Sequence, residues 1–330
     1  MAGGSRSDPF AALAAAERGL LRPAPLPDRV EPMKAVLTDE RFSDPDWVFE
    51  RKLDGIRCVA IKDGRRVRLL SRNHLSLDAR FPEVVAALQA DPATRLVLDG
   101  EVVAFDGAAT SFAALQQRGE RPVPVFLYAF DLLHLAGQDT TALPLRARKT
   151  LLRGAVASGG PLRIAQHRNA EGEALYREAC RKGWEGLIAK RADAPYVHGR
   201  SRDWLKLKCS AEQELVIGGY TEPRGSRTDL GALLLGVYDG DGRLRYAGKV
   251  GTGFTRATLR DLAERLAPLR SGRSPFADDP RERGATWVTP ELVAQVGFSE
   301  WTRDGRLRHP RFLGLREDKP AREVVRETPP

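Results

Sequence analysis

The ten residues FERKLDGIRC, Phe49 to Cys58, place five charged side chains inside a segment that otherwise resembles β-structure. An apolar run continues to Asp63-Gly64, and this dipeptide predicts a tight hairpin turn, because both central residues of a type I′ turn need positive φ. Lys52 therefore lies just before the first strand of an expected hairpin. Taken alone, Lys-x-Asp-Gly predicts only a lysine before a turn, so a solvated charge and a catalytic amine both remain open here.

The length and charge of the chain narrow the class of protein. A chain of 330 residues favours two domains, because one hydrophobic core rarely grows beyond about 250–300 residues. Lysine and arginine total 53 against 44 acidic residues. This excess favours an anionic partner, with nucleic acid ahead of a membrane surface, although a solvated arginine-rich surface explains it equally well.

Neither export nor a membrane location is expected. The N-terminus lacks a secretory signal pattern, and no run of about 18 apolar residues occurs. The cysteines Cys58, Cys180 and Cys209 are odd in number and widely spaced, with no CxxC or Cys/His pattern. The sequence therefore predicts neither a disulfide framework nor a zinc site, which fits a reducing cytoplasm.

The composition and residue pattern of the sequence divide the chain into three parts. Residues 1–32 are rich in alanine and proline, so we expect a lead-in that is flexible or lies along the protein surface. Residues 33–210 alternate apolar strand segments with short helical ones, such as EGEALYREACRKG, where Gly183 is placed to end a helix. Residues 211–330 contain short strands, glycine-rich turns and one amphipathic helix, which indicates a small β-barrel.

Seven short motifs occur in a fixed order along the chain: KLDGIR (52–57), SRN (71–73), DGE (99–101), FDLL (130–133), EGLIAKR (185–191), WLKLK (204–208) and REDK (316–319). This ordered set resembles the covalent nucleotidyltransferases, which include ATP- and NAD-dependent ligases and mRNA capping enzymes. Among these, GKVGTGF (248–254) and HPRFLGLREDK (309–319) look most like the ligase domain of bacterial ligase D, an end-joining DNA ligase.

The resemblance implies an α+β fold. Its first domain would be a nucleotidyltransferase (adenylation) domain of antiparallel sheets with flanking helices, and an OB-fold β-barrel would follow it. The expected activity is ATP-dependent sealing of 5′-phosphate/3′-hydroxyl breaks in duplex DNA through lysyl-AMP and AMP-DNA intermediates, in DNA repair such as end joining. The cofactors would be ATP and Mg²⁺ or Mn²⁺. We further expect a monomer in the bacterial cytoplasm, associated with the nucleoid, with a Ku-type end-binding protein as a partner.

The resemblance also assigns roles to individual residues. Lys52 would be the adenylylated nucleophile. The nucleotide site would use Glu50 on the adenine amino edge, Arg57 on the sugar or the DNA phosphate, Arg72 on the terminal 5′-phosphate, Glu101 on the ribose or a metal, Phe130 against the purine, Lys206 and Lys208 on the α-phosphate, and Arg316 and Lys319 on the β- and γ-phosphates. Glu185, with Glu101, would hold the metal, since hard divalent ions prefer carboxylate oxygen. Asp99 is not assigned to the site, because it could equally be a turn residue before Gly100.

The chemistry sets a condition on Lys52 that is independent of any resemblance. A lysine amine with an ordinary pKa of about 10.4 is neutral only about 0.04% of the time at pH 7. Lys206 and Lys208 alternate on one strand and so project to the same side. We expect these cations, with a bound metal, to lower the pKa of Lys52.

Other functions remain open. A guanylyltransferase of the capping type and an RNA ligase share the lysine motif and the barrel. A nucleic-acid-binding module with an inactive nucleotidyltransferase fold is the non-enzymatic alternative. It is disfavoured because Lys52, Lys206, Lys208 and Lys319 are all present. An NAD-dependent ligase is disfavoured because only about 46 residues precede Trp47 and no zinc-binding cysteine cluster occurs.

Overall fold

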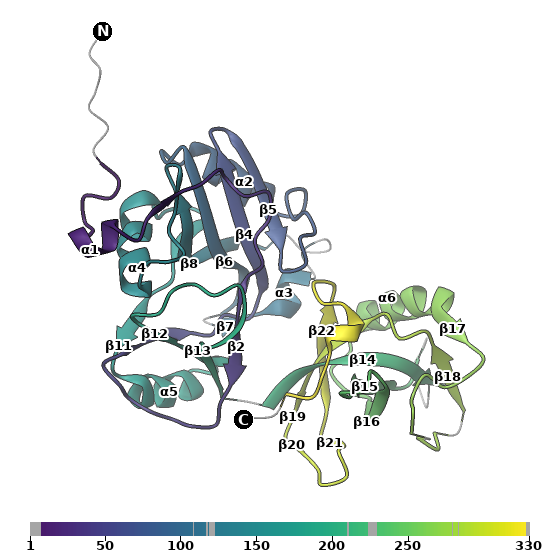
Figure 1. Ribbon diagram of the computed structural model, residues 1–330. Helices are drawn as coiled ribbons and strands as arrows, with labels where there is room; N and C mark the ends of the chain where they lie inside the picture. The colour runs from purple at the N-terminus through teal and green to yellow at the C-terminus, as the bar shows by residue number, and fades with distance from the viewer. Residues whose placement is uncertain are drawn as a thin grey trace. The chain divides into compact units, whose positions relative to one another are not determined.

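The computed structural model describes residues 8–107, 109–116, 118, 123–209, 211–223, 230–278, 280–282 and 284–327. The residues up to Cys209 form one compact unit, and the residues after it form a second. Figure 1 shows the sheets and helices of each unit. Among the described residues, no helix has the length and apolar character needed to cross a bilayer.

The larger sheet of the first unit is built around four long antiparallel strands. Its strand order is β1-β9-β8-β6-β4-β5, with β10 beside β8 and β7 beside β6. The strands are β1 (Arg22–Pro23), β4 (Ile56–Asp63), β5 (Arg66–Ser71), β6 (Arg95–Asp106), β7 (Ala109–Thr110), β8 (Val125–Leu135), β9 (Gln138–Asp139) and β10 (Leu162–Ile164). The hairpin predicted at Asp63-Gly64 is present, but of its residues only Gly64 has positive φ, so the type I′ expectation is wrong.

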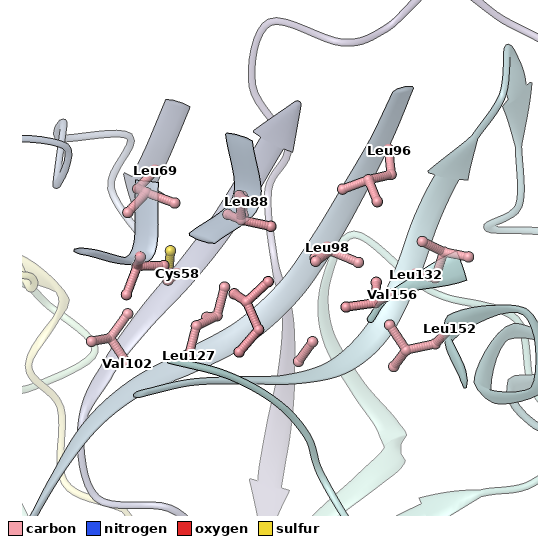
Figure 2. Packing of buried hydrophobic residues seen from close by; sticks show 14 of the residues in the cluster. Cys58, Leu69, Leu88, Leu96, Leu98, Val102, Leu127, Leu132, Leu152 and Val156 are labelled. Carbon is pink, nitrogen blue, oxygen red and sulfur yellow. The ribbon is translucent and has the colours of Figure 1, made fainter. Parts of the chain in front are cut away.

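Side chains alternate between the two faces of this sheet. On β4, Cys58 and Ala60 enter the core beneath the helices, whereas Val59 and Ile61 face the other way. The helices over the first face are α2 (Pro82–Ala90), α3 (Phe112–Gln116) and α4 (Leu145–Ala155). Figure 2 shows Cys58, Leu69, Leu98 and Leu127 within this core.

The second sheet of this unit has the order β11-β3-β12-β13-β2. Its strands are β2 (Met33–Leu37), β3 (Trp47–Arg51), β11 (His167–Asn169), β12 (Gly186–Arg191) and β13 (Gly199–Lys208). Helix α5 (Gly172–Arg181) covers one face, and Gly183, with φ 67°, follows the helix end as the sequence predicts. The other face meets the larger sheet through Met33 and Trp204.

Residues 8–32 contact the rest of the first unit through strand pairing and buried side chains. Helix α1 (Ala15–Arg18) forms there, and β1 pairs with β9. Leu13 is buried in the helix-covered core, and Val30 is buried against the opposite face of the sheet. The alanine and proline composition concealed these apolar anchors. Residues 1–7 lie outside the described residues.

The second unit is an OB-fold barrel with one core. Its main sheet has the order β16-β15-β14-β18-β17, and β19 joins β14 to β22. The elements are β14 (Ala211–Thr221), β15 (Leu233–Tyr238), β16 (Leu244–Val250), α6 (Arg256–Leu266), η2 (Ala267–Leu269), β17 (Arg270–Ser271), β18 (Ala285–Val288), β19 (Val293–Phe298), β20 (Glu300–Trp301), β21 (Leu307–Arg308), β22 (Arg311–Arg316) and η3 (Ala321–Glu323). Thr255 caps α6 by accepting a hydrogen bond from the Thr258 amide.

A disulfide joins Cys180 and Cys209, contrary to the sequence expectation. Gly183 ends α5 three residues before β12 begins, and β13 runs antiparallel to β12 with Lys208 opposite Gly186. The residue after β13 therefore returns to the end of α5. Cys58 is buried and free.

Candidate active site

The end of β3 places Lys52 beside the start of β12. The Lys52 amide donates to the Gly186 carbonyl at 2.9 Å, which extends the pairing of β3 with β12 by one residue. The Lys52 ammonium forms an ion pair with Glu185, the residue before β12. The Lys52 side chain is 20% exposed and that of Glu185 only 6%. The predicted nucleophile and the predicted metal ligand therefore lie in direct contact.

The environment of Lys52 corrects the expected direction of its pKa. Burial lowers the pKa of Lys52, but the contact with the Glu185 carboxylate, supported by Asp54 and Glu101, raises it more. The net pKa is therefore above the ordinary lysine value. In this state Lys52 is protonated, and Lys206 and Lys208 do not achieve the lowering that the sequence argument required.

Alternation along the strands brings most of the predicted residues to the space between the two sheets. On β4 and β6, Arg57 and Glu101 share a face with Val59 and Val97, which pack toward the second sheet. Phe130 belongs to the same cluster. In the second sheet, Glu50 lies on the face of β3 that is turned away from α5. Lys206 and Lys208 lie on the Trp204 side of β13.

Glu50 lies in a buried cluster of charges that the sequence did not reveal. Its side chain is 3% exposed and contacts two ammonium groups, those of Lys149 on α4 and of Lys190 on β12, the latter at 2.9 Å. Burial lowers the pKa of Lys190, Glu50 raises it and Lys149 lowers it, giving a pKa of about 8. The Lys190 nitrogen lies 4.1 Å from the ring centre of Phe130 and 4.0 Å from that of Trp204.

Arg57 is held by a second buried acid. Its Nε and Nη2 donate to the two oxygens of Asp99 at 2.6 Å each, and the guanidinium lies 4.9 Å from the ring centre of Phe130. The Tyr196 hydroxyl donates to Asp99 Oδ2 at 2.6 Å. Asp99 lies within β6 and is fully buried, so the turn interpretation is wrong. Both Arg57 and Lys190 lie near the ring that was predicted to stack on the purine.

The remaining predicted residues lie in two places. Arg72 is half-buried directly after β5 in the first unit. Arg316 and Lys319 belong to the second unit, where Arg316 donates to both oxygens of Asp318 at 2.8 Å and Lys319 donates to Glu214 at 2.7 Å. Both proposed phosphate clamps are thus paired with carboxylates of their own unit.

The donor set near Lys52 fits a hard divalent cation. Glu185 Oε2 is buried and has no hydrogen-bond partner among the described residues. An unpartnered buried carboxylate oxygen is costly unless a cation or another donor meets it. No group of three or more His, Cys, Asp or Glu side chains suited to a metal occurs in the part of the chain that the structure describes. The ion would therefore bind Glu185 together with substrate phosphates, as Mg²⁺ commonly does.

Two packed, mainly antiparallel sheets, with Lys52 at the end of a strand and an OB barrel after them, form the architecture of the covalent nucleotidyltransferases. Within that class, residues 28–208 match the model of the ATP dependent DNA ligase domain, and residues 226–319 match the ATP dependent DNA ligase C terminal region. The chain belongs to the ATP-dependent DNA ligase family.

Similar proteins support this assignment. The multifunctional non-homologous end joining protein LigD of Pseudomonas aeruginosa is 43% identical over 316 residues, covering 92% of this chain and 37% of the relative. The probable DNA ligase of Dictyoglomus thermophilum is 34% identical over 310 residues, covering 82% of this chain and 53% of that protein. The solved structure of mycobacterial DNA ligase D complexed with ATP and MES is 37% identical with a TM-score of 0.67, covering 90% of this chain and 98% of that one. The chain spans less than half the length of the LigD relatives.

Proposed function

We propose that this chain seals breaks in duplex DNA with ATP by way of a lysyl-AMP intermediate, in a repair process such as end joining. The observation that carries the proposal is the position of Lys52 at the end of β3, in contact with Glu185, inside the segment that matches the ligase domain. In the first step the Lys52 nitrogen attacks the α-phosphorus of ATP and pyrophosphate leaves. AMP then passes to the DNA 5′-phosphate, and the 3′-hydroxyl displaces AMP to close the strand.

Activation of Lys52 follows from its ion pair with Glu185. While that carboxylate is uncompensated, it holds the amine protonated. A divalent cation, Mg²⁺ or Mn²⁺, would supply positive charge at Glu185 and at the phosphates. Once the charge of Glu185 is neutralised, burial of Lys52 favours the neutral amine that attacks phosphorus.

The other site residues would position the nucleotide. Glu50 would accept a hydrogen bond from the adenine amino group, and Phe130 would stack on the purine. Lys206 and Lys208 would contact the α-phosphate. Arg57 would contact the ribose or the DNA phosphate, and Glu101 the ribose or the metal. Arg72 would contact the 5′-phosphate of the broken strand. Arg316 and Lys319 would orient the departing pyrophosphate, so phosphates must replace their present carboxylate partners.

Labelling tests this function directly. The purified protein is incubated with Mg²⁺ or Mn²⁺ and α-labelled ATP, GTP or NAD, separated under denaturing conditions, and chased with nicked duplex DNA. Label from ATP that leaves the protein as the strand lengthens is the expected result. Label from GTP alone would indicate capping chemistry, and transfer only to nicked RNA would indicate an RNA ligase. Mass spectrometry first checks for AMP already bound, and absence of any label would then favour a binding module.

The setting of the reaction is a further part of this proposal. A DNA substrate would place the protein with the nucleoid in the cytoplasm, and end joining would bring it, as a monomer, to a Ku-type end-binding protein. Sedimentation of the chain with and without such a protein on blunt duplex DNA measures both the oligomeric state and the association with the end-binding protein. Sealing of blunt ends that is unchanged by the end-binding protein would refute the proposed Ku-type partner.

A further inference from the structure

The disulfide lies where the strand carrying Lys208 ends. It joins the last turn of α5 at Cys180 to Cys209, the residue directly after β13. Both cysteines are half-buried. Cys209 is also the last residue of the first unit.

The backbone around this bond is shared with the candidate active site. The Cys209 amide donates to the carbonyl of Glu185 at 2.9 Å, and the Tyr176 hydroxyl of α5 donates to the carbonyl of Lys208 at 2.9 Å. Gly186 has φ 150°, and a Cβ added there would lie 2.0 Å from the Leu207 carbonyl oxygen. The Glu185 segment and the end of β13 are therefore packed backbone to backbone, and the disulfide is the covalent tie that fixes this contact to α5.

We propose that the Cys180–Cys209 disulfide is a redox-sensitive positioning element of the nucleotide site, which holds Lys208 and Glu185 in place for reaction with ATP. This role presupposes the proposed ligase chemistry. A dithiol would reduce this disulfide. One thiolate of the dithiol attacks a disulfide sulfur, and its second thiolate then resolves the mixed disulfide. Two electrons and two protons pass to the cysteines as the dithiol becomes a disulfide.

Reduction should loosen the site without unfolding the unit. The pairing of β12 with β13 and the burial of Leu207 against α5 should hold the unit together after reduction. What reduction releases is the covalent link from Cys209, the residue after Lys208, to the last turn of α5. Because a displacement of about 1 Å in a positioning group can lower a rate by about 10²-fold, we expect adenylylation to slow by about 10- to 100-fold.

The experiment measures single-turnover formation of lysyl-AMP on the oxidised and the dithiol-reduced full chain, with Cys180→Ser and Cys209→Ser beside them. Both variants should react at the slow rate whether or not the dithiol is present. Cys58→Ala is the matched control, since it keeps the disulfide and should respond to the dithiol as the unmodified chain does. ATP affinity measured by calorimetry should weaken about tenfold on reduction, because a charge-assisted contact with a phosphate is loosened.

A second readout separates positioning from stability. Thermal unfolding of the same four proteins reports the structural contribution of the crosslink. A lower melting temperature on reduction, with an unchanged adenylylation rate at 25 °C, would overturn the positioning role and leave a structural brace. Absence of label in both redox states would reject the proposed function. The calorimetric affinity for ATP needs no covalent step and would then test the positioning role of the disulfide. An affinity that is equal in the oxidised and reduced chains would refute that role.

Discussion

Lys190 is a buried lysine whose charge should destabilise the first unit at neutral pH. Its side chain is almost fully buried between Phe130 and Trp204, and its pKa of about 8 lies below the lysine value of 10.5. We expect Lys190→Met to remove this cost, because methionine fills similar space without a charge and the buried Glu50 keeps its contact with Lys149. The direction is unusual, since most substitutions of buried residues destabilise a protein.

The magnitude follows from linkage between protonation and folding. The folded pKa is lowered, so between pH 8 and 10.5 the folded chain binds fewer protons than the unfolded chain, and stability rises with pH. The full difference of about 2.5 pKa units corresponds to about 3 kcal/mol. Over the practical range from pH 7.5 to 9.5, the unmodified chain should gain about 2 kcal/mol relative to Lys190→Met, because methionine does not titrate.

Urea unfolding of both proteins at several pH values measures this difference, and comparison with the variant cancels the other titrating groups. Lys62→Met is the matched control, because Lys62 is equally buried but donates to the carbonyls of Leu88 and Asp91 at the end of α2. Its loss should cost about 1–3 kcal/mol at pH 7.5, since those carbonyls lose their donor. A stability difference between the unmodified chain and Lys190→Met that stays constant from pH 7.5 to 9.5 would refute the reasoning.

Three further predictions concern the nucleophile, the phosphate clamps and the core. Lys52→Ala should abolish labelling by ATP yet still seal a nick that already carries AMP, and failure on the pre-adenylylated nick would assign Lys52 a wider role. Arg316→Ala or Lys319→Ala should slow lysyl-AMP formation far more than sealing of pre-adenylylated DNA, and equal losses in both assays would contradict the clamp assignment. Arg148→Met should destabilise the chain by about 3–5 kcal/mol in urea, because it leaves the fully buried Asp131 carboxylate without its cation; a cost below about 1 kcal/mol would indicate that Asp131 is protonated.

Local sequence patterns were sufficient where the physics is local. The helix at EGEALYREACRKG ends before Gly183, because glycine adopts positive φ at little cost. The two lysines of WLKLK lie on one side of β13, because strand side chains alternate. The family motifs supplied the fold class, since they fix the order of the elements as well as their chemistry.

Contacts between distant segments could not be predicted in this way. Glu50 contacts Lys149 and Lys190, which lie about a hundred or more positions further along the chain. The Tyr196 hydroxyl reaches Asp99 across 97 residues. The disulfide depends on the return of β13 to the end of α5, which becomes visible only once β12 and β13 are known to pair. Burial and partner charges set a lysine pKa, so the raised pKa of Lys52 could not be predicted from the sequence either.

Three of the cations predicted for the nucleotide site share one property that the motifs do not express. Lys52 is paired with Glu185, Arg316 with Asp318 and Lys319 with Glu214. In each pair the cation already contacts a carboxylate. Under the proposed roles, ATP binding would therefore exchange carboxylates for phosphates at these three residues. Such an exchange lowers the net affinity, because each new contact first breaks an existing one. The Glu185 carboxylate raises the pKa of Lys52, so the proposed attack on ATP would need the charge of Glu185 to be neutralised first.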